Sequence, residues 1–421
     1  MLVARTVFAA PMLSKLSKPA TPCTRTSVRR WGIALLVALA NPAAADCPTD
    51  EDTKIIPLPV WSTSPNAGTT YGFMPVFIRV CPYDQHTQWV LAPSITHNGV
   101  IHTTGTIRLY DYPDADTTLS LIAGVSTRIN YRVVATRLHQ PTAPGAFTDE
   151  TYLRIDRDAF TRFFGLGMDS KESGESTYTA EREDVSERRG LNVGGDFNVG
   201  VAIGFEREAV LPMGVNGLPL APDAYPTVPG MVDPSLVIWQ GIDVRYDDRK
   251  GGDYAERGTR IDAGIAVVEG LIESPTFVRG SLEGRHLWPE LSWLSGATRL
   301  AYSGMSAASA PFYLQSTLGG GHLMRGFTEG RFYATQAWTA ELEQRIRVLR
   351  TNFFNVTTDW RVDPFVAVGQ VFDHADDIVA HPRFSVGAGL RIFVHPNIVG
   401  RVDFAYAGEG IKIYVEIGYP Y

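Results

Sequence analysis

Side chains that could do catalytic chemistry gather in two places. The segment Asp373-His374-Ala375-Asp376-Asp377 sets three carboxylates around an imidazole, a combination that could bind a cation or form an acid/base pair. Ser303, Ser306 and His322 are the residue types of a lipase-like hydrolase, but no nucleophile motif surrounds either serine. An exposed acidic loop tip explains the first segment more simply. The sequence therefore predicts no enzyme activity, no metal site and no cofactor.

The elements that carry these residues follow an export signal. Residues 1–45 hold six basic residues and no acidic one, and the apolar run 31–40 leads to Ala43-Ala44-Ala45. A basic start, a short apolar core and a small-residue end are typical of a secretory signal peptide. The run is shorter than the roughly 20 residues that cross a bilayer as a helix. We expect cleavage after Ala45, a short periplasmic tail over 46–52, and no room there for a periplasmic domain.

The charge balance after cleavage is acidic. Without the six basic residues, 32 basic side chains face 45 acidic ones, a net charge of −13. That balance argues against nucleic acid as a partner, because phosphate binding needs a basic patch. Plentiful glycine and interleaved polar and apolar residues fit an outer-membrane barrel, but a soluble periplasmic β-protein would look similar.

The last residues favour the barrel. Ile411, Ile413, Val415, Ile417, Tyr419 and Tyr421 alternate with mostly polar residues such as Lys412 and Glu416. Successive side chains of a strand face opposite sides, so one face is apolar throughout. A lipid-facing outside and a wet inside require that pattern. We interpret Ile417, Tyr419 and Tyr421 as the signal for insertion by the barrel assembly machinery, which predicts a bacterial outer-membrane location in contact with lipid.

Runs of membrane-spanning length number about sixteen. They lie at 53–64, 69–81, 87–97, 100–112, 118–138, 176–187, 193–208, 235–248, 258–269, 274–288, 298–308, 335–348, 360–372, 383–394, 398–407 and 411–421. An even number places both ends of residues 53–421 in the periplasm. The long connections, such as 139–175 and 309–334, then all lie outside. The expected fold is an all-β, transmembrane antiparallel barrel of about 16 strands.

Two cysteines remain after the signal is removed. Cys47 precedes the first strand and Cys81 ends the second, so both would lie near the periplasmic rim of an oxidising compartment. They could form a disulfide that pins the tail, or they could be unrelated thiols.

One motif is more specific than the strand pattern. Leu318-Gly319-Gly320-Gly321-His322-Leu323-Met324-Arg325-Gly326-Phe327 lies in the sixth outer loop of this count. Three further segments lie before and after this motif in the order that one family of barrels shows. They are Asp247-Asp248-Arg249, Ala340-Glu341-Leu342-Glu343-Gln344-Arg345 and Ser385-Val386-Gly387-Ala388-Gly389. Over about 235–421 the chain resembles the BamA/TamA-type superfamily, the bacterial surface antigen family of outer-membrane barrels.

The resemblance implies a role for the arginine of this motif. In the family the loop folds into the lumen and sets its arginine against acidic residues of the wall, which a guanidinium can bind through two donors. That arginine would be Arg325, within a loop-lock motif of Met324, Arg325, Gly326 and Phe327. Glu343 is the first-choice partner, with Glu341 beside it. Ala367 stands where the family often has a second acid, so Glu343 would act alone or with Asp403; the alternative is that Arg325 is a solvated loop residue.

The resemblance also implies a function. Its members insert barrel proteins or export polypeptides and use periplasmic POTRA domains, for which we expect no room here. The leading hypothesis is an assembly or translocation barrel that moves or inserts polypeptide or lipid with a separate periplasmic partner or as a homo-oligomer. The alternatives are a passive pore or structural surface antigen, and an outer-membrane hydrolase.

Overall fold

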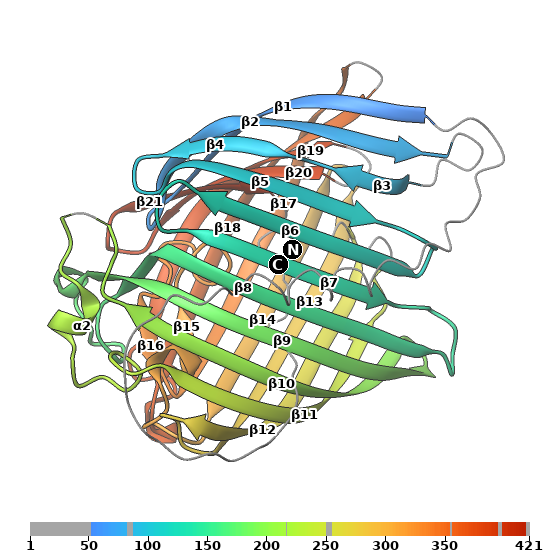
Figure 1. Cartoon of the computed structure of the whole chain (residues 1–421). Coiled ribbons are helices and arrows are strands. Elements are labelled where there is room, and N and C mark those ends of the chain that lie inside the picture. The colour runs from blue at the N-terminus through green and yellow to red at the C-terminus, as the bar shows by residue number, and fades with distance from the viewer. Residues whose placement is uncertain are drawn as a thin grey trace, which may run out of the picture.

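A single antiparallel sheet closes on itself into a barrel in the computed structural model of the chain (Figure 1). The structure describes residues 52–81, 87–215, 217–249, 255–353, 356–394 and 398–417. The sheet holds 19 strand segments, of which β3 and β4 pair with the same neighbours, β2 and β5, and form one interrupted strand. The barrel therefore has 18 strands.

Strand bounds show how the chain winds. The first half of the wall is β1 (Asp52–Ser64), β2 (Gly68–Val80), β3 (Thr87–Leu91), β4 (Ser94–Asn98), β5 (His102–Asp111), β6 (Thr117–Ser126), β7 (Tyr131–His139), β8 (Phe147–Phe163), β9 (Ser176–Gly194) and β10 (Phe197–Leu211). The second half is β11 (Ser235–Asp247), β12 (Gly258–Ile272), β13 (Phe277–Leu291), β14 (Leu294–Met305), β17 (Gln336–Phe353), β18 (Val356–Phe372), β19 (Arg383–Val394), β20 (Ile398–Tyr406) and β21 (Ile411–Ile417). Each strand pairs antiparallel with the next along the chain.

The predicted count of about sixteen is wrong by two strands. The run expected at 118–138 is two strands, β6 and β7, which turn at 127–130. The connection expected at 139–175 contains β8, a strand of 17 residues. The extra hairpin adds an outer loop, so the loop that carries Arg325 is the seventh and not the sixth.

Along the strands, side chains alternate between an apolar outer face and a polar inner face of the barrel. In β19, Phe384 and Val386 are exposed on the outer face, whereas Ser385 and Arg391 are buried inside the barrel. Because lipid wets one face of the wall and the lumen lies behind the other, this alternation is what a membrane barrel requires. It also delivers charged side chains from many strands to one interior.

Closure is made by the first and last strands. β1 and β2 share thirteen registered pairs and β20 and β21 share seven, but β1 and β21 share one pair among the described residues, Thr63 with Val415. Backbone ladders hold a sheet together, so a seam with one registered pair is the weakest line in the described wall.

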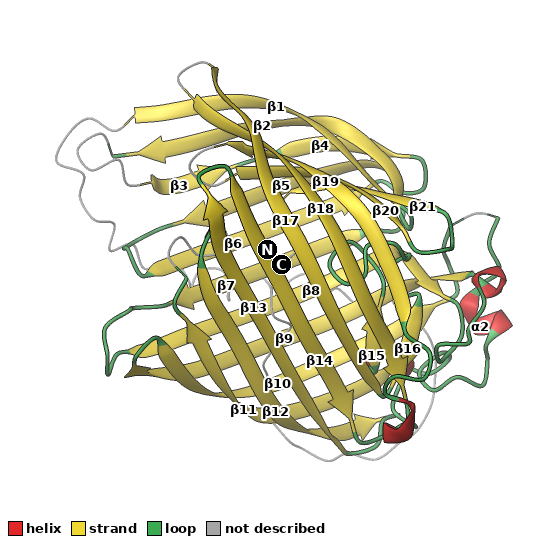
Figure 2. Ribbon diagram, turned by 180° about the vertical axis from the view of Figure 1, so that it is seen from behind, coloured by secondary structure: helices red, strands yellow, loops and turns green. Residues whose placement is uncertain are grey.

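The long connections gather at one end of the barrel. Figure 2 shows the helical turns, in red, at that end, among them α2 (Ala221–Ala224). The 3-10 turns Glu172–Gly174, Phe312–Leu314 and Ala375–Asp377 lie in the same set of loops. No helix in the described part of the chain is long and apolar enough to span a membrane.

Several predicted features fall outside the described residues. These are the signal peptide 1–45, the tail to residue 51 with Cys47, and the terminal aromatics Tyr419 and Tyr421. Ile417 is the last residue of β21. Cys81 is disulfide-bonded.

Candidate functional site

The seventh outer loop, residues 306–335, turns back into the barrel. Its two arms pair as the short strands β15 (Ser316–Leu318) and β16 (Phe332–Ala334). Beyond β15, Gly319 and Gly320 have φ of +114° and +102°, values that favour glycine, and a Cβ on Gly319 would lie 2.2 Å from the carbonyl oxygen of Thr328. The glycines thus make the tight bend that carries the tip inward.

Arg325 sits at that tip and is fully buried. Its Nη2 lies 2.5 Å from Oε1 of Glu341 and 2.9 Å from Oε2 of Glu343, both on β17, and its Nη1 lies 3.0 Å from Oδ1 of Asp403 on β20. The guanidinium also stacks on Phe365 of β18, 3.4 Å from the ring centroid. We call Arg325, Glu341, Glu343 and Asp403 the lock cluster. It joins the loop to strands on both sides of β18 and β19.

A ring of further charges surrounds the lock cluster. Arg345 Nε lies 3.0 Å from Glu343, and Arg391 Nη2 lies 2.8 Å from Asp403. Arg391 also reaches Asp363 at 3.3 Å, and Arg401 reaches Asp403 at 3.4 Å. The lock cluster and these four residues together contain four carboxylates and four guanidiniums. A buried charge is tolerated when it is paired and hydrogen-bonded, so balance keeps this network stable inside the barrel.

The residues beside Arg325 contact the wall through backbone atoms. Gly326 N donates to Ser385 Oγ at 3.0 Å, and the Tyr414 hydroxyl donates to the carbonyl oxygen of Phe327 at 2.7 Å. A Cβ on Gly326 would lie 2.5 Å from Cβ of Ala407. Met324 is fully buried with φ of +58°, an uncommon conformation for a residue with a side chain. The tip is thus fitted against β19, β21 and the turn after β20.

The structure brings together the residues that the sequence analysis singled out for this loop. Arg325 contacts Glu343 and Glu341, and it contacts Asp403 as well. Ala367 pairs with Glu341 across β17 and β18, so that position supplies no acid. The second wall strand that contributes a carboxylate to Arg325 is therefore β20.

Three other arginines hold the loop, and the loop motif in the sequence predicts this role for none of them. Arg299 Nη1 and Arg401 Nη1 donate to the carbonyl oxygens of His322 and Gly321, at 2.5 and 3.0 Å. Arg331 lies 2.8 Å from Glu409 in the turn before β21, and donates to Ser170 in the loop after β8. Inward positions on alternating strands could have pointed to Arg299 and Arg401. No local pattern links Arg331 to a partner 161 residues away.

Replacing Arg331 with alanine is expected to destabilise the long-loop end by about 1.5–3 kcal/mol, since it removes hydrogen bonds to a charged group. The Arg331 guanidinium is nearly buried and also stacks on Phe332, 4.4 Å from the ring centroid. Urea unfolding of the barrel in liposomes measures the change. Arg383, an exposed arginine at the same end, is the matched control. If the unfolding midpoints of Arg331→Ala, Arg383→Ala and the wild type are equal, Arg331 does not stabilise the loops at this end.

An aromatic cluster covers the loops above the lock cluster. Phe163, Tyr178, Phe312, Tyr313 and Tyr333 pack together from β8, β9 and the seventh loop. Burial raises the pKa of the Tyr313 phenol, whose oxygen lies 2.9 Å from Ser235 Oγ. The cluster fixes the seventh loop to the wall independently of the charges below.

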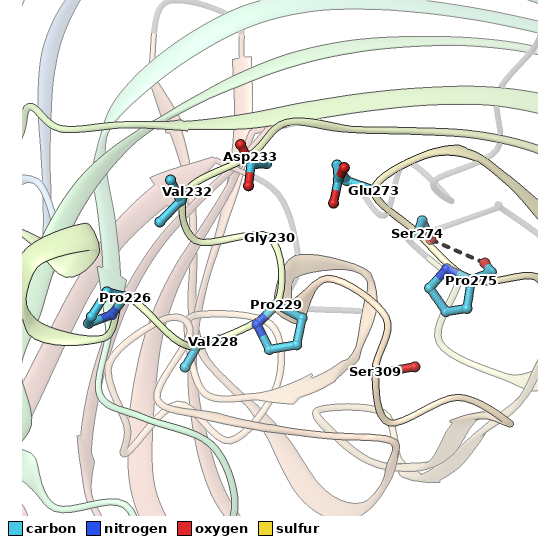
Figure 3. A pocket seen from close by; sticks show the side chains of 10 residues that line it. All are labelled: Pro226, Val228, Pro229, Gly230, Val232, Asp233, Glu273, Ser274, Pro275 and Ser309. Atoms are coloured by element: carbon cyan, nitrogen blue, oxygen red, sulfur yellow. Dashed lines mark hydrogen bonds between the residues drawn. The ribbon is translucent and has the colours of Figure 1, made fainter.

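A pocket of about 450 Å³ opens beside this cluster (Figure 3). Asp233 and Glu273 come from two loops that border it, and Pro229, Pro275 and Ser309 complete much of its lining. Two carboxylates do not make a cation site, and the described residues contain no group of three or more possible metal-binding side chains. The pocket is a recess between loops.

The other chemistry-bearing residues have ordinary contacts. Asp373 Oδ1 accepts hydrogen bonds from the backbone N and the hydroxyl of Thr335, both at 2.9 Å. Ser303 Oγ lies 2.9 Å from Ser316 Oγ, Ser306 Oγ accepts from Val278 N, and His322 lies 4.0 Å from Glu416. The two serines and the histidine are therefore not assembled as a nucleophile and its base.

Part of the chain matches a known family model, and the fold resembles solved structures. Residues 233–413 match the model of the Omp85 superfamily domain. BamA from Haemophilus ducreyi lacking POTRA domains 1–3 has a similar structure, with 12% identity and a TM-score of 0.53 over 86% of this chain and 75% of that one. No curated protein matches the sequence.

Two further structures with some likeness are CdiB proteins. CdiB from Escherichia coli is 10% identical over 86% of this chain and 62% of its own, with a TM-score of 0.48. CdiB from Acinetobacter baumannii is 12% identical over 88% and 59%, with a TM-score of 0.42. This chain spans less than two thirds of either CdiB chain.

A closed antiparallel barrel with a greasy outside and a charged interior defines the class as an integral outer-membrane protein of a bacterium. Within that class, residues 233–413 match the Omp85 superfamily domain, and the barrel resembles that of BamA in fold.

Proposed function

We propose that this barrel moves or inserts polypeptide or lipid at the outer membrane, and that its client passes or leaves through an opening of the β1–β21 seam. The observation that carries the proposal is that the described residues of β1 and β21 share one registered pair, Thr63 with Val415. Sequence kinship with the Omp85 superfamily and the fold shared with BamA support an assembly or translocation role.

The plugged lumen supports the same proposal. A passive pore gains nothing from a loop held by one fully buried arginine and three buried carboxylates. A barrel that must stay sealed while its wall opens needs a plug that is fixed to the rest of the wall. Arg325 contacts β17 and β20, and these contacts remain when β1 separates, so they can keep the plug in place. Separation of the first hairpin would break the two hydrogen bonds between Glu329 of the loop and Asn66.

A cross-link tests the role of the seam. Thr63→Cys with Val415→Cys should join β1 to β21, whereas Thr104→Cys with Ser126→Cys joins β5 to β6 at an ordinary registered pair. The probe is the folding of an unfolded eight-stranded outer-membrane barrel into proteoliposomes, followed by its heat-dependent gel shift. Wild type and the control pair should accelerate folding, and the seam cross-link should abolish the acceleration until it is reduced.

Other outcomes decide against the proposal. If the seam cross-link accelerates folding as well as the control pair, the seam does not open for the client. If wild type fails to accelerate folding and instead conducts as a steady wide channel, the protein is a passive pore. A separate periplasmic partner belongs to the proposal, and adding periplasmic extract to the assay measures its contribution.

A further inference from the structure

Charged side chains interrupt the lipid-facing surface on β7, β8 and β9. Asp149 follows the exposed Phe147 by two residues on β8, and Arg189 precedes the exposed Leu191 by two on β9, so each shares the outer face. Arg137 on β7 and Glu187 on β9 occupy the same face through their pairing with Thr151. We call Arg137, Asp149, Glu187 and Arg189 the outer charge patch.

The patch lies at the depth of the membrane interior. The next strand, β10, presents an unbroken row of apolar side chains on this face. The row consists of Phe197, Val199, Val201, Ile203 and Phe205. Arg189 pairs with Val201 and Glu187 pairs with Ile203, the centre of that row. Cationic side chains on the lipid face of a barrel are most costly at this depth.

Ion pairs within the patch balance its charges, but two of its side chains remain exposed on the outer face. Arg189 reaches Asp149 and Glu187, both at 2.5 Å, and Arg137 pairs with Asp149. Thr151 Oγ1 donates to Glu187 at 2.7 Å. Even so, the side chain of Arg189 is 63% exposed and that of Arg137 is 37% exposed. Two guanidiniums therefore face hydrocarbon with donors to spare, while apolar side chains of similar volume would cost nothing.

We propose that the outer charge patch is the centre of an interface with a second copy of this chain, side by side in the membrane. A two-fold axis along the membrane normal keeps every residue at its own depth. The patches of two copies can then form ion pairs with each other only if positive and negative side chains lie at the same depth in the membrane. The charged groups of Arg189 and Glu187 meet this condition, since they contact each other. Arg189 of each copy meets Glu187 of the other, and the exposed Phe147, Leu191 and Val201 pack around them.

Charge and depth favour this occupant over a lipid headgroup. The patch has two positive and two negative groups, so it offers a phosphate no net attraction. It also lies beside the centre of an apolar row, where acyl chains and not headgroups are found. A self-complementary surface needs no other molecule to satisfy its charges.

Site-specific cross-linking in native membranes tests the proposal. Val201→Cys places a thiol on β10 directly beside Arg189 of the patch. Val386→Cys on β19 places one on a similarly exposed part of the outer face; the two valines are 59% and 53% exposed. A short bismaleimide should give a dimer with Val201→Cys and none with Val386→Cys. Adding Arg189→Glu should abolish the dimer, and Arg189→Glu with Glu187→Arg should restore it, because the exchange renews the complementarity.

Each result has one meaning. A monomer with Val201→Cys in the otherwise unchanged chain overturns the proposal, and no folding defect can explain that outcome. An equal yield of dimer from Val386→Cys, or an undiminished dimer with Arg189→Glu, overturns it as well. An adduct of another mass shows that a different protein occupies the patch. The heat-dependent gel shift reports that each variant is folded.

Discussion

Replacing Arg325 with alanine should lower the stability of the folded barrel by about 3–5 kcal/mol, the usual cost of removing one partner from a buried ion pair. Glu341, Glu343 and Asp403 would lose the cation that they share at 2.5, 2.9 and 3.0 Å. Arg345 and Arg391 would remain beside two of these acids, so the loss falls most heavily on Glu341. Urea unfolding in liposomes, followed by tryptophan fluorescence, measures the change.

Two further variants serve as comparisons for Arg325→Ala in that measurement. Arg325→Lys keeps the charge but has one point donor group in place of a planar fork, so it should recover less than half of the loss. Arg347→Ala removes an arginine of β17, the strand that carries Glu341 and Glu343. Arg347 is not buried, so its loss should change the midpoint little. A wild-type midpoint for Arg325→Ala would show that the cluster does not hold the loop.

The second large effect should come from Gly326→Ala, which removes no charge at all. The new Cβ would lie 2.5 Å from Cβ of Ala407, 2.7 Å from Oγ of Ser385 and 3.0 Å from the carbonyl carbon of Tyr406. The Cβ of Ala407 and the carbonyl carbon of Tyr406 move only with the backbone, so the tip must withdraw and carry Arg325 away from the wall. Overpacking of this kind costs typically about 1–3 kcal/mol, to which the strained ion pairs add.

Cysteine labelling reports the withdrawal directly. Thr328 is buried beside the tip, so Thr328→Cys should react slowly with a membrane-impermeant maleimide while the loop is docked. Gly326→Ala should speed the reaction at least tenfold. Gly284→Ala is the control, because its Cβ would meet nothing within 4 Å. Equal labelling rates in all three backgrounds would contradict the close fit.

Much of the wall was predictable because lipid and lumen impose a two-residue period on each strand. β8 was missed because it breaks the period: Asp149 and Arg157 point outward while Glu150 and Arg154 point inward. Its outward charges are compensated by neighbouring strands, which no single-strand pattern reveals. Asp149 is also a member of the outer charge patch.

The hairpin between β6 and β7 was missed for a different reason. Its turn contains no glycine or proline, and Ile129 adopts φ of +67°, a conformation that a β-branched residue rarely takes. Hydrogen bonds from Asn130 and Ser126 hold the turn in place of a favourable local sequence. A sequence pattern reports local preference, and here the neighbouring strands override it.

In the lock cluster, too, residues near the loop in sequence were predictable, and residues far from it were harder to predict. Glu341 and Glu343 lie on the strand that follows the loop, so the motif and its neighbour indicate them together. Asp403 and Arg401 come from a strand about 80 residues on, and their contacts with the loop depend on barrel closure. Arg331 depends on closure even more strongly, since its partners flank the loop on both sides of the sequence.

The contacts that hold the plug and the seam that would open overlap at β21. The loop is fixed to β17, β20 and β21, and its Glu329 also exchanges two hydrogen bonds with Asn66 in the turn between β1 and β2. The contacts with β17, β20 and β21 remain when β1 separates from β21. The lumen can therefore remain blocked while the wall opens beside it.

Single-channel conductance in a planar bilayer tests this arrangement most directly. We expect a small, flickering conductance for the wild type and a larger one for Arg325→Ala, in which the plug is released. A steady, wide conductance in the wild type, unchanged in Arg325→Ala, would contradict it.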